Sequence, residues 1–151
     1  MLNSDRFYVS RSTLILLAAC VWYSGVIILV LKSYQLFNAA HLIQSGKPFV
    51  WVSIIAAVLI GLIKARYMFV PVCKKNIIRI RHLVNPKLWD FYRFRFYVFL
   101  ATMVSLGMYF SVRVQGDYLG LILLGIIDLS VASALFFSSY CFWNRKNNAT
   151  Y

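Results

Sequence analysis

One carboxylate, Asp128, lies inside an apolar run of the sequence, about ten residues after that run begins. A charged side chain at mid-membrane costs about 2.5–3.5 kcal/mol on insertion scales, and such residues often serve proton or ion pathways. Three interpretations stay open: a structural carboxyl group hydrogen-bonded to a neighbouring helix, a proton-coupled transport residue, and an ion pair with Lys64. The hydroxyl groups expected within reach belong to Ser130, Ser133, Ser105 and Thr102.

A basic segment, residues 64–96, carries the densest positive charge in the chain. Within it, Ile77, Ile80 and Leu83 recur at helical spacing, while the Lys and Arg residues fall mostly on the other faces. This pattern predicts a short amphipathic helix that lies on the membrane surface. The pair Asn85-Pro86 is expected to end it.

The basic segment is the strongest candidate for a contact surface. Each Lys or Arg near an anionic membrane adds about 1 kcal/mol of attraction. We therefore expect contact with anionic lipid headgroups first, with an acidic protein partner or a phosphorylated lipid-linked substrate as alternatives, and nucleic acid as an unlikely partner. The expected contact residues are Lys74, Lys75, Arg79, Arg81, Lys87, Trp89, Arg93 and Arg95.

Several kinds of chemistry lack the residues they need. Both histidines, His41 and His82, fall in expected loops, so a bis-histidine haem inside a bundle is not expected. The three cysteines, Cys20, Cys73 and Cys141, form no C-x-x-C pair, and no hydrolase, metalloprotease or phosphate-loop motif is present. We expect no catalytic residue, no metal and no cofactor.

Composition places the chain in a membrane. Of its 151 residues 62% are hydrophobic and only 13% charged, against roughly 45–50% and 25% in soluble proteins. A spanning helix needs about 20 mostly apolar residues. The sequence predicts one transmembrane domain over residues 1–151, a four-helix bundle with helices at about 13–31, 48–70, 94–112 and 118–143 and a basic loop at 71–93. Pro71 is expected to end the second helix, and Gly116 to turn the chain between the third and fourth.

The positive charges predict the orientation. Most of the 16 Lys and Arg residues lie in the second loop and in the two terminal segments. Because cytoplasmic segments carry the excess of Lys and Arg, both termini and the basic loop are expected in the cytoplasm. The expected location is a bacterial inner membrane.

Small residues recur every four positions in three of the expected helices, which lets helices approach closely in a membrane. Packing within one chain is expected, ahead of a seam between two copies. The residues are Ala57, Gly61 and Ala65 in the second helix, Ala101 and Ser105 in the third, and Ser130, Ala134 and Ser138 in the fourth.

The stretch from Gly61 to Tyr67 has the pattern G-x-x-K-x-R-aromatic and leads into the basic residues beyond Asn76. It resembles small bacterial polytopic membrane proteins in which a helix ends in this pattern. The resemblance covers roughly 25 residues. It implies a multi-helix bundle, assigns no activity and transfers no site residue.

These observations favour a non-enzymatic accessory or scaffolding protein that contacts anionic lipids or an acidic partner through its basic loop. The first alternative is a small proton-coupled transporter centred on Asp128, which would need a second copy of the chain for a substrate pathway. The last is an enzyme on phosphorylated lipids that binds phosphate through Arg79, Arg81, Lys87 and Arg93, with Asp90 as its carboxylate.

Overall fold

The helices account for nearly all of the chain that can be described. The computed structural model describes residues 10–44, 49–84, 87, 92 and 94–143, and for residues 95–97, 99 and 100 the backbone alone. The helices are α1 (Arg11–Ile43), α2 (Phe49–Lys64), α3 (Val70–His82), α4 (Phe94–Arg113), α5 (Tyr118–Ser138) and α6 (Tyr140–Trp143), and a π-helical turn, η2 (Ala65–Phe69), joins α2 to α3.

Three helical stretches are long and apolar enough to cross a membrane. They are Arg11–Ile43, the continuous stretch Phe49–His82, and Tyr118–Trp143. Their length and composition indicate a membrane protein. Helix α4 has 20 residues, and its bounds agree with the prediction of 94–112 to within one residue.

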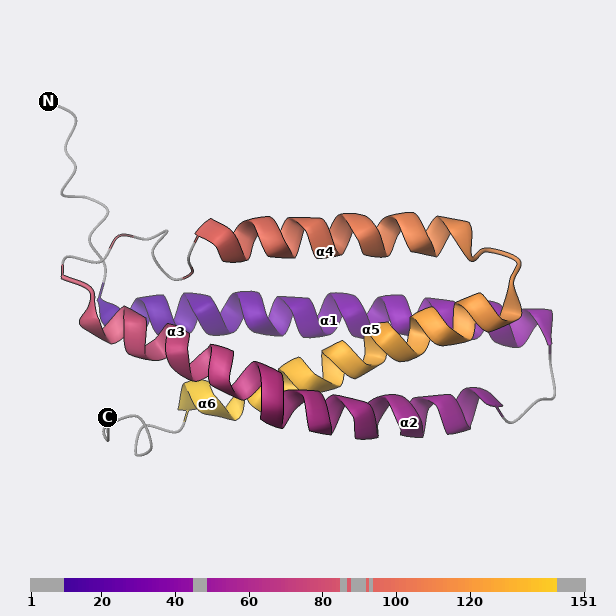
Figure 1. The fold of residues 1–151 in the computed structure, drawn as a ribbon, viewed down its shortest axis with the longest axis horizontal. Helices are drawn as coiled ribbons and strands as arrows, with labels where there is room; N and C mark the ends of the chain where they lie inside the picture. Colours follow the sequence, from indigo (N-terminus) through magenta and orange to yellow (C-terminus); the bar gives the residue numbers. More distant parts are fainter. Residues whose placement is uncertain (1–9, 45–48, 85–86, 88–91, 93, 144–151) are drawn as a thin grey trace, which may run out of the picture.

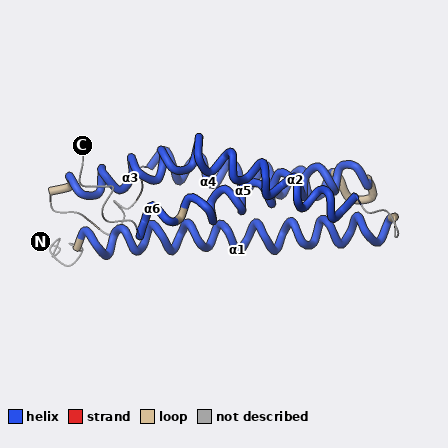
Figure 2. The backbone as a smooth tube through the Cα atoms, turned by 90° about the horizontal axis from the view of Figure 1, so that it is seen from below, coloured by secondary structure: helices blue, strands red, loops and turns tan. Residues whose placement is uncertain are grey.

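The helices lie lengthwise along one axis, and α5 occupies the centre of the bundle (Figures 1 and 2). Helix α5 packs mainly on α1 and α2, and only lightly on α4. In Figure 1, α4 and α2 lie on opposite sides of α1. We call the end where α1 begins and α3 terminates the basic end, and the end with the α1–α2 and α4–α5 connections the hairpin end.

A tight turn at the hairpin end connects α4 to α5, as the sequence predicted. Gly116 has φ 89°, in the left-handed region that favours glycine. Asp117 follows as the N-cap of α5, where its carboxylate accepts hydrogen bonds from the backbone N–H groups of Leu119 and Gly120 at 3.3 and 3.2 Å. These bonds satisfy two of the free donors at the helix start.

The prediction that Pro71 ends the second helix is wrong, because the helix continues through it to His82. Proline lacks an N–H group, and its ring clashes with the carbonyl of the residue four positions earlier. The chain accommodates Pro71 by widening the preceding turn: the Val70 N–H bonds the Ala65 carbonyl, five residues back. The segment predicted as a loop over 71–93 is thus helical over its first half.

The first helix is also longer than predicted. It does not end near Leu31 but runs to Ile43. The prediction ended this helix at Leu31, the last residue of the uncharged run, and so placed Lys32 in the loop that follows. In the structure Lys32 lies within α1, where a carboxylate on another helix compensates its charge.

The amphipathic pattern of α3 is confirmed, but its apolar face packs on protein rather than on a membrane surface. Ile77 and Ile80 are buried against Leu14, Ala18 and other residues near the start of α1. The centre of this basic-end cluster is Trp22, whose ring contacts those of Phe69, Tyr92 and Phe142. Its indole N–H donates to the Leu135 carbonyl at 2.8 Å.

Two of the three small-residue stripes form the contact between α2 and α5, as expected for packing within one chain. Gly61 has the closest approach: a Cβ atom there would lie 2.6 Å from Ser133 Cβ and 2.8 Å from the Ser130 carbonyl oxygen. The stripe on α4 differs, since Ala101 and Ser105 are exposed. The buried members are Ala57 and Gly61 on α2, Ala65 on η2, and Ser130, Ala134 and Ser138 on α5.

The close approach at Gly61 predicts that Gly61→Ala destabilises the bundle by about 1–3 kcal/mol, the usual cost of overpacking. Gly25→Ala is the matched control, because its Cβ would meet Leu135 at an ordinary 3.5 Å. Unfolding by SDS in mixed micelles measures both. Equal midpoints for the two variants would contradict the α2–α5 contact.

Cys73 and Cys141 come from α3 and α6 and are both buried inside the basic-end cluster. The sequence contains no adjacent thiol pair, so this arrangement depends wholly on the fold.

In a Cys20→Ser background, oxidation with copper-phenanthroline is expected to join Cys73 to Cys141 in a disulfide. The expected change in mass is the loss of two hydrogen atoms per molecule. An additional Cys73→Ser substitution abolishes that loss. A failure to join the two thiols would exclude the packing of α3 on α6.

Candidate functional site: a polar layer in the bundle

Four polar side chains form a layer across the middle of the bundle, between the basic-end cluster and the apolar cluster at the hairpin end. They are Lys32 on α1, Lys64 on α2, and Asp128 and Ser130 on α5. The helical backbone carbonyls of Gly107 and Ile127 complete the layer. All four long segments, α1, α2, α4 and α5, therefore contribute to it.

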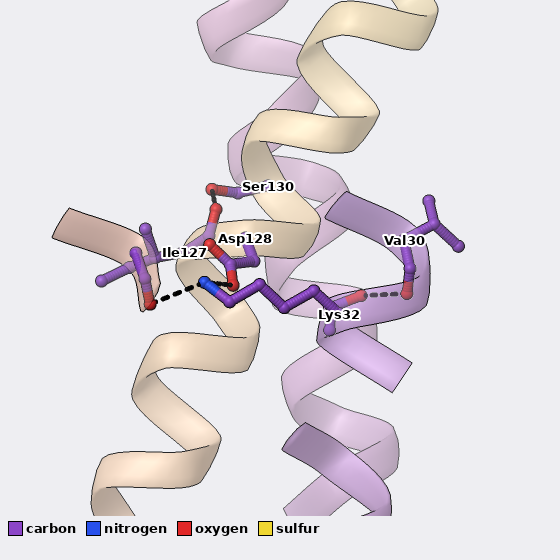
Figure 3. Close-up of polar contacts among 7 residues, drawn as sticks. Val30, Lys32, Ile127, Asp128 and Ser130 are labelled. Atoms are coloured by element: carbon purple, nitrogen blue, oxygen red, sulfur yellow. Dashed lines mark hydrogen bonds and ion pairs between the residues drawn. The ribbon is translucent and has the colours of Figure 1, made fainter. Parts of the chain in front are cut away.

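Lys32 and Asp128 form an ion pair inside the bundle, with Nζ and Oδ2 separated by 3.0 Å. Figure 3 shows the Lys32 side chain reaching from α1 to the carboxylate on α5. The Asp128 side chain is 8% exposed and that of Lys32 22%. The contact is electrostatic, with the geometry of an ion pair rather than of an aligned hydrogen bond.

The same ammonium group also attaches α4 to the bundle. Lys32 Nζ donates a hydrogen bond of 2.9 Å to the Gly107 carbonyl oxygen. A glycine suits this position, because a Cβ atom on residue 107 would lie 2.9 Å from Lys32 Nζ. A single charged side chain thus connects α1, α4 and α5.

Lys64 does not pair with Asp128, so that interpretation is wrong. Its Nζ donates to Ser130 Oγ at 3.0 Å, and the Ser130 hydroxyl in turn donates to the Ile127 carbonyl at 2.8 Å. Asp128 and Ser130 lie two residues apart on a helix and so point in different directions. The carboxylate therefore faces α1 and α4, whereas the serine faces α2.

Sequence reasoning missed the partner of Asp128 because it assigned Lys32 to a loop. One signal was present: counting from the hairpin end, Lys32 lies about 16 Å along α1 from Ile43, and Asp128 lies about 15 Å along α5 from Tyr118. The two residues are thus at matching depths. That comparison requires α1 to continue past Leu31, and only the structure shows this.

The layer carries an ion pair, one further ammonium and the Ser130 hydroxyl, and no second carboxylate accompanies them among the described residues. In that part of the chain no group of three His, Cys, Asp or Glu side chains could hold a metal ion. The arrangement is suited to fixing helices in position.

The predicted contact residues on α3 lie together at the basic end. Lys75 is exposed, while Lys74, Arg79 and Arg81 are half-buried. Arg11, at the start of α1, joins this surface by donating to the Leu83 carbonyl at 3.3 Å. Of the other predicted residues Lys87 is exposed, Trp89 and Arg93 lie outside the described residues, and so does the side chain of Arg95.

Comparisons with known protein families, with curated proteins and with solved structures found no match. The interpretation therefore depends on the geometry of this chain alone.

The ion pair predicts a strongly non-additive double-mutant cycle. Asp128→Asn leaves the Lys32 ammonium without its counter-charge and should destabilise the bundle by about 3–5 kcal/mol, the range for breaking one side of a buried pair. Lys32→Met should do likewise. The double variant should lose less unfolding free energy than the sum of the losses in the two single variants. Unfolding in mixed micelles measures all three.

Lys64→Met serves as the control for that cycle. It removes a single hydrogen bond to Ser130, so the expected loss is about 0.5–1.5 kcal/mol. Additive effects of Asp128→Asn and Lys32→Met would show that the two charges do not interact in the folded protein.

Proposed function

We propose that this chain is a non-enzymatic accessory or scaffolding protein of a bacterial inner membrane, and that its basic end contacts anionic lipid headgroups. In this proposal α1, α2, α4 and α5 all cross the bilayer, and both termini and α3 face the cytoplasm. The basic end is then the cytoplasmic end of the bundle.

The observation that carries the proposal is the division of α3 into two faces. Ile77 and Ile80 on its apolar side are already buried against α1, so these two residues are not available for insertion into lipid. Its cationic side remains on the surface, with Lys75 exposed. Among the described residues the carboxylates are Asp117, at the hairpin end, and Asp128, in the polar layer.

The helix lengths support contact at headgroup depth. The link between Lys32 and Gly107 aligns α4 beside α1. At 1.5 Å per residue, Phe94 lies about 20 Å from Gly107, whereas Arg11 lies about 32 Å from Lys32. If α4 spans the hydrocarbon layer, the start of α1 lies about 12 Å beyond the start of α4. The headgroup layer is roughly 5–8 Å thick, so the basic end extends through it.

Exposed aromatic side chains support the same placement. Trp51 near one end of the α2–η2 segment and Tyr67 near the other are 74% and 75% exposed. Trp143, at the end of α6, is 65% exposed. Amphipathic rings of this kind are enriched where lipid meets water.

The transporter alternative receives less support. Asp128 already has a fixed cation, Lys32, and this pair joins three helices, so the carboxylate has a structural role that accounts for its position. The enzyme alternative depends on Asp90 and Arg93, which lie outside the described residues.

The proposal predicts that neutralising α3 reduces the selection of anionic lipid. In nanodiscs that contain phosphatidylglycerol and phosphatidylcholine, native mass spectrometry should detect retained phosphatidylglycerol. Lys74→Gln with Lys75→Gln should lower that preference about thirtyfold, because each cation contributes about 1 kcal/mol. High salt should weaken it in the same way.

Arg113→Gln is the control, because it removes an exposed cation at the hairpin end, over the ring of Tyr109. If both variants retain phosphatidylglycerol equally, the headgroup contact is wrong. A protein partner that co-purifies in stoichiometric amounts and is lost with the α3 variant alone would replace lipid as the ligand of the basic end.

A further inference from the structure

A groove of about 680 Å³ opens between α1 and α2 in the hairpin half of the bundle. Leu129 of α5 contributes to its lining, and residues of α1 and α2 form the rest. Its volume lies within the range of roughly 300–1,000 Å³ that small-molecule sites occupy. The lining residues on which the argument depends are Val30, Tyr34, Asn38 and His41 from α1, and Trp51 and Ile54 from α2.

The groove has an apolar part and a polar part. Val30 and Leu129, which are close in sequence to Lys32 and Asp128, line the part nearer the polar layer, and Ile54 packs against the apolar cluster at the hairpin end. Asn38 and His41 lie toward the hairpin end, within two turns of the last residue of α1. Both are exposed, and each carries N–H groups that can donate hydrogen bonds to an anionic oxygen.

Two aromatic lining residues of the groove are exposed, whereas the third, Phe37, is buried. Tyr34 is 69% exposed and Trp51 74%. An O–H and an indole N–H on large apolar rings fit a site with one wet end and one apolar end. Among the described lining residues there is no carboxylate that would repel an anion.

The dimensions match one leaflet of a bilayer. From Val30 to His41 the groove follows α1 for about 16 Å. Half of a hydrocarbon core of about 30 Å is about 15 Å. An acyl chain that enters along the membrane normal would thus run from the polar layer to the hairpin-end interface.

We infer that this groove binds one acyl chain of a phospholipid, whose phosphate lies beside Asn38 and His41. The site lies at the opposite end from α3 and does not depend on the proposed headgroup contact of the basic end. The groove takes its phospholipid from the leaflet opposite the one that α3 contacts. The apolar lining holds the chain, and the donors at the hairpin end hold the phosphate.

The test is lipid retention by the full chain, purified in a mild detergent with added phosphatidylglycerol and followed by native mass spectrometry. The wild type should retain one phospholipid that survives delipidating wash. Ile54→Trp or Val30→Trp fills the apolar part and should lower that retention at least tenfold. Leu59→Trp is the control, since Leu59 is an exposed residue of α2 outside the groove.

A second arm tests the headgroup. Asn38→Leu with His41→Leu should lower retention several-fold while the apolar part stays intact. Inorganic phosphate at millimolar concentration should not displace the lipid from the wild type, which separates a phospholipid from a free phosphate. Joining Cys73 to Cys141 by oxidation, at the far end of the molecule, verifies that each variant is folded.

Three results would overturn the inference. Equal retention by Ile54→Trp, Val30→Trp and Leu59→Trp would mean that the lipid is annular and not held in the groove. Displacement by inorganic phosphate would make the site one for a free anion. Unchanged lipid retention after the Asn38 and His41 substitutions would show that these two side chains do not bind the phosphate.

Discussion

A charge inside a membrane protein needs a counter-charge close by, and the pair Lys32–Asp128 meets that requirement. The Nζ–Oδ2 distance is 3.0 Å, and the same ammonium bonds the Gly107 carbonyl. Removing either partner leaves a charge in a medium of low dielectric, which is far more costly than the pair itself. This one ammonium group therefore links α1, α4 and α5 at one level of the bundle.

Around that layer the packing changes character from end to end. At the basic end, Trp22 and its aromatic neighbours form a cluster that also buries the apolar face of α3. Between α2 and α5, small residues allow backbone contact that a Cβ at Gly61 would prevent. On the hairpin side, α1 and α2 leave a groove between them. The close contact between small residues holds α2 on α5, while the groove between α1 and α2 provides space for a ligand.

The two proposed lipid contacts differ in physical basis. At the basic end the attraction is electrostatic, depends on several cations of α3 and weakens with salt. In the groove the main contribution is burial of an acyl chain, which is insensitive to salt. The membrane would thus hold the protein by its charge in one leaflet and by an inserted chain in the other.

The sequence by itself determined the features that depend on local order. Apolar runs of about 20 residues predicted membrane helices, Gly116 predicted the turn before α5, and the spacing of Ile77 and Ile80 predicted an amphipathic helix. Tertiary structure decided whatever depends on a partner far away in the chain. Lys32 can lie within a helix only because Asp128 faces it. Helix α3 packs on α1 because Pro71 widens a turn instead of ending the helix, and Cys73 lies in the same buried cluster as Cys141 for the same reason. A local pattern shows which face of a helix is apolar, but only the assembled bundle shows what covers it.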